Sequence, residues 1–489
     1  MSPALPGSPL RVLVVHHGRR PVPGAPAPGA AIRAQALGDG IAAAGFAVVY
    51  LTRAADAPGG FDGAADLRRK AAALRPDRVV CVQAEDAPAL AGLGVPLAVD
   101  LYAPRLLEAP FEGTLAAEAP ALLRAIAAAD VLLVSNPRAR LVWLGVLALA
   151  GLDTRTDPTL LVPLAAPAAL PVGAGLPAPA ADPVIVAGGA AWPWQDPVPA
   201  LEAALAVLDA RGAGRIDWYG GPPVLGAATA AWSLPAHPRL RCPGWVGLDA
   251  FRRACAEATL AFDLMAPNPE RAASFSFRHT EYLGAGLPVL TGPDTALADV
   301  LGGAGWLAAP ADAGPALAAA LDDRALPDRR AAARALADTL HPARAAAPLA
   351  AWLAAPVRHP RGKGPLHGAA TALARAAADR GRAALREADA ARLQDQVHTL
   401  LGTVDRLTRA LDEVAGFKRE AVTLLGHREE AARLDAAALA RENALLRADV
   451  EKKSAELLAA DQLRARLEND IAGLRREVAA LQRRGLFPR

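Results

Sequence analysis

The spacing of hydrophobic positions changes near Pro365. Before it, short apolar runs alternate with longer Ala/Leu-rich segments; after it, apolar residues recur every three or four positions. Short apolar runs joined by helical segments predict parallel β-sheets with helical crossovers, whereas the later spacing predicts a coiled coil. The sequence therefore predicts an α/β protein that continues into a long helical tail.

The apolar runs before Pro365 form two series. We expect strands at 11–16, 47–51, 78–82, 97–99, 131–134 and 160–162, and again at 183–187, 215–219, 240–242, 259–264, 288–290 and 306–307. The Pro/Ala/Gly-rich stretch 165–182 between the series is typical of a linker. We therefore expect two tandem, doubly wound, Rossmann-like domains, 1–164 and 183–356, whose ligand-binding edges can face each other.

The tail is expected as one helix over 369–486, after a second linker at 357–368. Its heptad seam runs first through Leu393, Val397, Leu400, Val404, Leu407, Leu411 and Val414, and then through Leu439, Leu446, Val450, Leu457, Leu467, Ile471, Leu474, Val478 and Leu481. The registers meet at Lys418, Arg428 and Asp435 through a stutter, which unwinds a supercoil locally. Asn443 falls at an a position, where a buried amide often favours two strands. We expect the tail to form a homodimer or bind a partner protein; the alternative is a solvated single helix.

Composition argues against several classes of protein. The 53 basic and 50 acidic residues leave a net charge of +3 without a polybasic run, so nucleic-acid binding is not expected. Cys81, Cys242 and Cys255 form no CxxC pair, which argues against disulfides and structural zinc. No signal peptide is recognisable, and the longest apolar stretch, 141–152, is shorter than the roughly 20 residues of a membrane span. We expect a cytoplasmic protein, at most peripheral at the inner membrane, with 141–152 as a buried helix.

A first candidate site follows the first strand of the second series. Gly188 and Gly189 end this strand, and Asp196 is the expected N-cap of the next helix. Backbone N–H groups and the helix dipole at such a position attract a diphosphate. Trp192 and Trp194, on a polar loop, are expected to pack on a ligand or on the opposite domain. The alternative is that the glycines only make a turn.

A second candidate site covers 269–292. Here Phe275 and Phe277 can anchor the start of a helix that presents polar side chains to a cleft, namely Ser276, Arg278, His279 and Glu281. A guanidinium neutralises phosphate oxygens, and a carboxylate can hold ribose hydroxyls. The alternative is an ordinary amphipathic helix with solvated charges.

This second segment resembles the donor-site motif of retaining GT-B glycosyltransferases of the group 1, family 4 type, in which a helix bearing Glu runs into AxGLPV, here from Glu281 to Val289. Blocks at 139–151, 188–203 and 270–290 further resemble a branch of bacterial surface-polysaccharide glycosyltransferases. The resemblance covers roughly residues 10–355 and leaves out the tail. It implies a GT-B fold and transfer of a hexose-like unit from a nucleotide diphosphate sugar to a glycan or lipid-linked acceptor, with retention of configuration.

The resemblance also implies roles for individual residues. Arg278 would contact the donor diphosphate and Glu281 the ribose, and the other candidate donor-binding residues are Gly188, Gly189, Trp192, Trp194, Tyr219, Gly220, Glu270, Ser276, His279 and Thr280. In the wider family an acidic residue lies eight positions before the helix Glu, but this chain has Ala273 there, and Glu270 is the nearest carboxylate. The family's Arg and Lys pair is not recognisable either. No DxD-type metal motif occurs, so we expect neither a metal nor a cofactor besides the donor substrate.

The acceptor site is expected in the first domain. His16 and His17 end the first strand, and Asp100 and Tyr102 follow the fourth, so all four lie at the ligand-binding edge of an open sheet. We take His16 and Asp100 as candidate catalytic residues; the alternative is that they are packed or capping residues.

Two other functions remain open. A non-catalytic GT-B scaffold that presents the coiled coil is compatible with Ala273. A sugar-nucleotide epimerase would need several acid/base groups around the cleft, and the first domain shows few candidate carboxylates in sequence.

Overall fold

The computed structural model describes residues 9–54, 57–167, 182–222, 232–359, 365–431 and 436–483. The chain forms two compact units, a body (Met1–Ala378) and a tail (Asp379–Arg489). Most of the linker expected at 165–182 and part of that expected at 357–368 lie outside the described residues.

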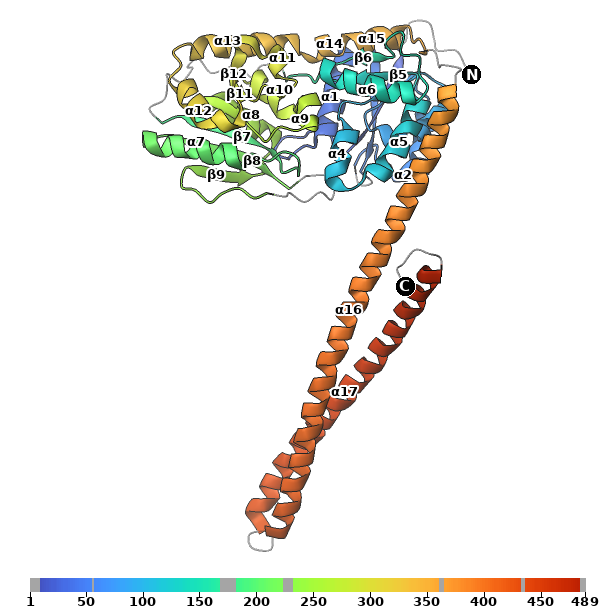
Figure 1. Ribbon diagram of the computed structural model, residues 1–489, viewed down its shortest axis with the longest axis vertical. Helices are drawn as coiled ribbons and strands as arrows, with labels where there is room; N and C mark the ends of the chain where they lie inside the picture. Colours follow the sequence, from blue (N-terminus) through green and yellow to red (C-terminus); the bar gives the residue numbers. More distant parts are fainter. Residues whose placement is uncertain are drawn as a thin grey trace. The chain divides into compact units, whose positions relative to one another are not determined.

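The body contains two six-stranded parallel sheets (Figure 1). The first has the order β2-β1-β3-β4-β5-β6, with strands β1 Arg11–His17, β2 Ala47–Arg53, β3 Arg78–Cys81, β4 Leu97–Asp100, β5 Val131–Val134 and β6 Thr159–Leu161. The second has the order β12-β11-β10-β7-β8-β9, with strands β7 Val184–Ala190, β8 Arg215–Gly221, β9 Leu240–Gly244, β10 Leu260–Asp263, β11 Val289–Thr291 and β12 Gly305–Leu307. All twelve expected strands are confirmed, with some ends shifted, because buried parallel strands have continuous apolar runs that are visible in sequence.

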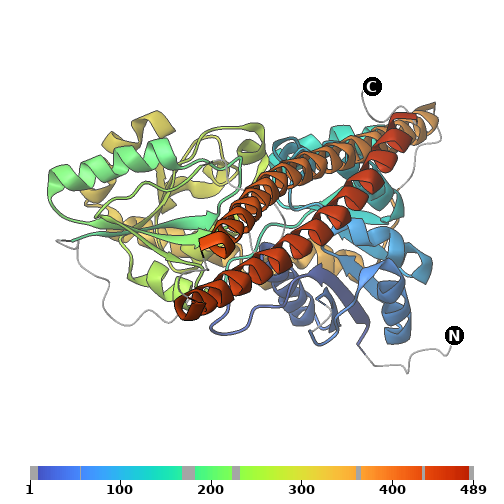
Figure 2. The same ribbon diagram turned by 90° about the horizontal axis from the view of Figure 1, so that it is seen from below.

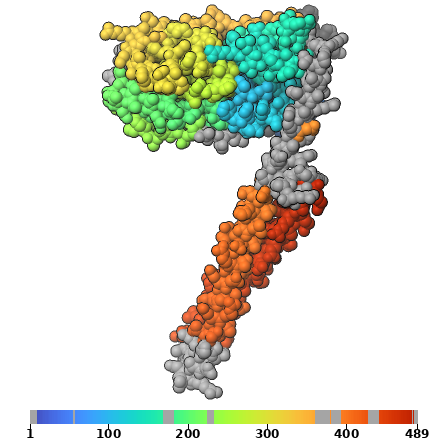
Figure 3. All heavy atoms as spheres, viewed as in Figure 1, coloured from blue at the N-terminus to red at the C-terminus, as the bar shows by residue number. Residues whose placement is uncertain are grey.

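Helices connect the strands and cover both sheets. In the first domain they are α1 Gly29–Ala43, α2 Gly63–Leu74, α3 Ala87–Leu90, α4 Arg105–Glu112, α5 Leu115–Ala128 and α6 Pro137–Leu149. In the second domain they are α7 Val198–Arg211, α8 Leu248–Glu257, α9 Pro269–Ala273, α10 Phe277–Gly284, α11 Ala298–Leu301, α12 Ala313–Leu321 and α13 Leu326–Thr339. The atoms of the two domains adjoin along a continuous seam in the space-filling view (Figure 3).

Helices α14 (Pro342–Ala345) and α15 (Ala347–Ala354), which follow α13 of the second domain, return to the first domain. Leu349, Trp352 and Leu353 share a hydrophobic core with residues of the first sheet. The core of the first domain thus includes residues that the expected boundary at 356 assigned to the second. The sequence could not show this, because an apolar helix face does not specify which sheet it covers.

Helix α6 contains most of the apolar stretch expected to be a buried helix. Trp143 and Leu147 are buried, but Leu141 is 73% exposed and Leu149 is also exposed, so the helix lies at the surface with one face inward. Uniform apolar composition hid this orientation in sequence. Among the described residues, no helix has both the length and the apolar character needed to cross a membrane.

The tail consists mainly of two long helices, α16 (Pro365–Ala431, which begins in the body) and α17 (Ala436–Arg483) (Figure 2). Lys453 Nζ of α17 lies 5.5 Å from the Phe417 ring centroid of α16, and Arg464 interacts electrostatically with Asp412. Phe417 of α16 thus lies beside Lys453, whereas the earlier residue Asp412 interacts with the later residue Arg464. The two helices therefore run antiparallel.

This hairpin corrects the expectation of one continuous helix over 369–486. The stutter positions mark the region of the reversal, and residues 432–435, which include Asp435, lie outside the described residues. The seam positions in this region are charged, at Lys418, Arg428 and Asp435. A continuous coiled coil would therefore have no apolar side chains to bury at these positions. Two seam residues, Leu411 and Ile471, are buried within the single chain.

Candidate functional site

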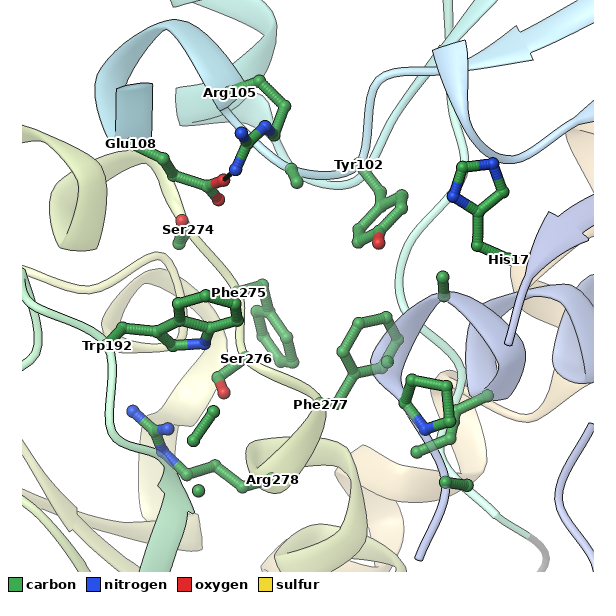
Figure 4. Close-up of a pocket in the computed structure, with 18 of the residues that line it drawn as sticks. His17, Tyr102, Arg105, Glu108, Trp192, Ser274, Phe275, Ser276, Phe277 and Arg278 are labelled. Atoms are coloured by element: carbon green, nitrogen blue, oxygen red, sulfur yellow. Dashed lines mark hydrogen bonds and ion pairs between the residues drawn. The ribbon is translucent and has the colours of Figure 1, made fainter. Parts of the chain in front are cut away.

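A cavity of 510 Å³ lies between the two domains of the body. Its first-domain wall comes from segments at the ends of β1, β3 and β4, and its second-domain wall from segments at or after the ends of β7, β8, β9 and β10. Figure 4 shows side chains of both walls around this space. The cavity therefore lies where open α/β sheets bind ligands, beyond the carboxyl ends of their strands.

Direct contacts join the domains beside this cavity. Asn136 caps α6 through Oδ1, and its Nδ2 donates to the backbone oxygen of Ala273 at 2.9 Å. The Phe277 ring meets the Tyr102 ring with 5.6 Å between centroids, and it occupies the space that a side chain at Gly29 would need. These contacts set the spacing of the two walls.

Arg278 reaches from α10 to the end of β7. Its Nε donates to Asp263 Oδ1 at 2.6 Å, and its Nη1 and Nη2 donate to Gln195 Oε1 at 3.1 and 3.2 Å. A Cβ atom at Gly189, where φ is +125°, would lie 2.5 Å from Nη1, so glycine is what permits this approach. Both Gly189 and Arg278 line the cavity, as the sequence analysis predicted.

Asp263, at the end of β10, holds this guanidinium in place and was missed in the sequence. It is fully buried and also accepts from Arg271 Nη2 at 2.8 Å and His279 Nε2 at 2.6 Å. Burial alone would raise the pKa of Asp263, but the charges of Arg271, Arg278 and His279 hold it well below its usual range. An acidic residue at the end of an expected strand was the available signal. His279 lies behind the cavity wall, so its expected contact with a donor is wrong.

Glu281 lines the cavity, but its carboxylate already has a partner. Arg252 Nε donates to Oε2 at 2.6 Å and Arg252 Nη2 donates to Oε1 at 2.9 Å, which forms a bidentate ion pair. A ribose bound here would have to share or displace this pair. The contact between Glu281 and a donor ribose stays a prediction.

Three expected donor contacts have structural roles instead. Cβ atoms at Gly188 and Gly220 would lie 1.9 and 2.0 Å from the backbone oxygens of Tyr219 and Gly189, so both glycines allow β7 and β8 to pair closely. Thr280 is buried and donates from Oγ1 to the backbone oxygen of Phe277. None of the three lines the cavity, because close strand pairing and a buried helix face both turn them away from it.

The segment before α7 contributes side chains rather than a helix terminus. Pro197 is the N-cap of α7, one residue later than expected, and Asp196 Oδ1 accepts from the backbone nitrogen of Val198 at 2.9 Å. The cavity wall includes Gln195 but no residue of the first turn of α7. The expected diphosphate site at this helix terminus is therefore not part of the cavity wall.

Aromatic side chains form another part of the wall. Trp192 and Trp194 stack with 4.9 Å between centroids and 12° between planes, and Trp194 contacts Phe111 of the first domain at 5.9 Å. Of the two expected outcomes, packing on a ligand or on the opposite domain, the second is seen for Trp194 alone, and a ligand contact of either indole stays a prediction. Tyr219 lines the cavity beside Phe251, and Ser276 lines it from the N-cap of α10, as expected.

The Glu108 carboxylate of the first domain lies near Ser274 of the second (Figure 4), and Glu270 of the second domain also lines the cavity. Glu270 Oε1 accepts from Ser274 Oγ at 2.6 Å, and burial raises the pKa of Glu270. Burial also raises the pKa of Glu108 to about 7, since nearby Glu270 adds to the effect and the charge of Arg105 only partly opposes it. Glu108 and Arg105 were missed in the sequence, because they lie in a helix after the strand end, where charged residues are usually solvated.

On the first-domain side, the histidine that lines the cavity is His17, not His16 as expected. His16 is buried against Tyr50 and does not line the cavity, whereas His17 does, with Nε2 2.7 Å from Asp86 Oδ2. Successive side chains of a strand point to opposite faces of the sheet, so His16 and His17 point in opposite directions and only one of them can face the cavity. The expected catalytic role of His16 is therefore wrong.

Asp100 lines the cavity, but it is committed to an ion pair. Its Oδ2 accepts from Arg33 Nε at 2.7 Å, and Arg33 also donates to the backbone oxygens of Val162 and Pro163. Burial raises the pKa of Asp100, although Arg33 opposes this. The pair fixes the end of β4 and positions Tyr102, which lines the cavity.

Replacement of the buried imidazole is expected to make the protein less sensitive to acid. Burial lowers the pKa of His16 to about 4, whereas an unfolded histidine titrates near 6.5. Between pH 6.5 and 4, His16 is therefore protonated in the unfolded chain but neutral in the folded chain. This difference in proton binding lowers the free energy of unfolding by about 3 kcal/mol over that pH range. His16→Phe should remove this part of the acid loss in urea titrations followed by tryptophan fluorescence. His398→Phe, at an exposed position, is the control; parallel pH curves for His16→Phe and the native chain would contradict the prediction.

Comparisons with known proteins bear on the fold. No protein-family model matches the chain, and no curated protein matches its sequence. Among solved structures, the trehalose-6-phosphate synthase OtsA is similar with a TM-score of 0.54 and 13% identity, over 71% of this chain and 100% of that one. The α,α-trehalose 6-phosphate synthase of Burkholderia multivorans gives 0.50 and 13%, over 71% and 96%. Anabaena HepE, solved with UDP-glucose, gives 0.49 and 13%, over 71% and 99%. The body thus has the two-domain GT-B fold.

Proposed function

We propose that this protein is a glycosyltransferase that uses a nucleotide diphosphate sugar. The observation that carries the proposal is the approach of the Arg278 guanidinium to Gly189 in the wall of the interdomain cavity. A cation beside a strand end that lines a cavity suits a diphosphate. The similar fold of two trehalose-6-phosphate synthases supports the same class of reaction.

In the proposed reaction, the bond from the anomeric carbon to the donor phosphate oxygen breaks and a bond to the acceptor oxygen forms. The nucleoside diphosphate leaves, and the hydroxyl proton of the acceptor leaves with it. Arg278 would stabilise the negative charge that develops on the departing phosphate. In other enzymes a metal ion provides this stabilisation. We propose that the reaction needs no metal and retains the anomeric configuration.

The biological setting follows from the sequence resemblance. We propose a glycan or lipid-linked acceptor, a role in cell-surface polysaccharide synthesis, and a cytoplasmic location that is at most peripheral at the inner membrane. The carboxyl ends of the first sheet, with His17 and Tyr102, would face the acceptor.

The test is turnover with a panel of radiolabelled nucleotide sugars, each with and without cell-envelope acceptors. Release of nucleoside diphosphate and labelling of an acceptor would support transfer. Binding of nucleotides without turnover of any donor would favour the non-catalytic scaffold. The ion pairs of Glu281 with Arg252 and of Arg278 with Asp263 are compatible with that alternative, because they can hold the fold together without a ligand.

One observation favours the epimerase as a second candidate. The first domain was expected to supply few carboxylates, but Glu85, Glu108 and Glu118 all line the cavity. Conversion of a nucleotide sugar to its epimer without any acceptor, detected by chromatography of the sugar nucleotide, would establish that activity instead of transfer.

The tail is proposed to join two copies of the chain or to bind a partner protein. Leu445, Leu458 and Leu463 of α17 are exposed, whereas part of the seam is already buried within the hairpin. We expect the full-length protein to be a dimer or larger by light scattering, and a chain ending at residue 364 to be a folded monomer. A full-length monomer would contradict association through the tail.

A further inference from the structure

An excess of negative charge marks one part of the cavity. Arg105 in α4 forms ion pairs with Glu108 at 2.6 Å, Glu112 at 3.0 Å and Glu118 at 2.9 Å. One guanidinium therefore faces three carboxylates, and Glu270 adds a carboxyl group from the second domain. Arg105 has no charge left over for an anionic ligand.

Two buried polar atoms of the same wall have no hydrogen bond of normal geometry within the part of the chain that the structure describes. Glu270 is 3% exposed, and its Oε2 makes no hydrogen bond of normal geometry among the described residues. Trp194 is 4% exposed, and its Nε1 is likewise unpaired within the described part of the chain. Leaving such groups unpaired costs roughly 1–3 kcal/mol each. A sugar offers the matching groups, because a hydroxyl can donate to a carboxyl oxygen and accept from an indole N–H.

The two segments that carry these atoms are tied together. Asn268, the N-cap of α9, donates from Nδ2 to the backbone oxygen of Trp194 at 2.6 Å, and Glu270 lies in the first turn of that helix. The stacked indoles of Trp192 and Trp194 add an apolar surface beside them. Aromatic faces with nearby hydroxyl partners suit the ring of a carbohydrate.

We propose that this region, the acidic subsite formed by Glu108, Glu118, Glu270, Trp192 and Trp194, binds the ring of an uncharged sugar and rejects sugars that carry a carboxylate or phosphate. The inference rests on the proposed function and narrows its substrate class. The ring can belong to the donor or to the acceptor, because Gln195 accepts from Arg278 and also interacts with Glu270 of the subsite, and both substrates meet at the reacting carbon. An anionic group would be placed against carboxylates whose nearest cation is already paired.

Matched pairs of sugars test this proposal. Binding of methyl glucoside and methyl glucuronide, and of UDP-glucose and UDP-glucuronate, would be measured by saturation-transfer NMR and tryptophan fluorescence. We expect the uncharged member of a pair to bind at least about tenfold more tightly. A preference between the methyl glycosides in the presence of UDP would assign the ring to the acceptor, and a preference only between the nucleotide sugars would assign it to the donor.

Charge removal on the wall should reduce the discrimination. Glu118→Gln is expected to lower the ratio of the affinity for the uncharged sugar to that for the anionic sugar about tenfold. Glu108→Gln should lower this ratio less near neutral pH, because burial raises the pKa of Glu108 to about 7. Glu202→Gln, on the exposed face of α7, should leave the ratio unchanged. Equal or tighter binding of the anionic members, or no binding of any uncharged sugar, would overturn the proposal. Turnover of a nucleotide sugar together with tight binding of the uronates would refute the subsite alone. A preference for uncharged sugars without any turnover would refute the transferase alone.

Discussion

Arg278→Ala is expected to lower the rate of sugar transfer by roughly 10²–10³-fold, the usual cost of removing one charge-stabilising group from an active site. The variant loses the cation beside Gly189 but should still fold, because Asp263 keeps Arg271 and His279 as partners. Initial rates with the donor identified from the nucleotide-sugar panel, together with a thermal unfolding curve, measure both effects.

Two further variants sharpen this prediction. Arg278→Lys should recover little activity, because a single ammonium cannot reach Asp263 and Gln195 in the geometry that the guanidinium uses. Arg253→Ala removes an exposed arginine of α8 and should leave the rate unchanged. Native turnover by Arg278→Ala would remove the central support for the proposed function.

Alanine at Gly188 is expected to destabilise the body severely, by about 3 kcal/mol or more, or to prevent folding. Its Cβ would meet the backbone oxygen of Tyr219 at 1.9 Å, and backbone of the paired strands cannot move aside cheaply. In a body of this size, a loss of about 3 kcal/mol lowers the melting temperature by roughly 4 °C. Circular dichroism and the yield of soluble protein would measure it.

Gly189→Ala provides the comparison, because its Cβ would meet the movable end of Arg278 at 2.5 Å rather than backbone. We expect a smaller loss of stability than at Gly188 and a larger loss of nucleotide affinity, measured by calorimetry with UDP and GDP. Gly145→Ala in α6 is the control, since open space surrounds the added carbon and alanine favours a helix. Equal melting temperatures for Gly188→Ala and Gly145→Ala would contradict the role given to Gly188.

The sequence determined the framework of the body and part of its site. Buried parallel strands and their helices have periodic apolar patterns, so both series of strands and their tandem order were readable. The strand end and the helix that follows it indicated a ligand site at Gly189, and the family resemblance implied one at Tyr219; both residues line the cavity. Arg278 was placed there from its polar position at the start of an expected helix. The tail was recognised as helical from its heptads, and its association stays a prediction.

Only the tertiary structure decided which of these side chains face the ligand space and which hold the others. The direction of His17 rather than His16, the burial of Asp263 under two arginines, and the pairing of Glu281 with Arg252 each depend on contacts between distant segments. The return of α15 to the first domain and the reversal of the tail depend on the same kind of contact. Local patterns specify elements because propensity and periodicity act over a few residues. Partners of charged groups are chosen by packing across the whole chain, where desolvation makes an unpaired charge costly.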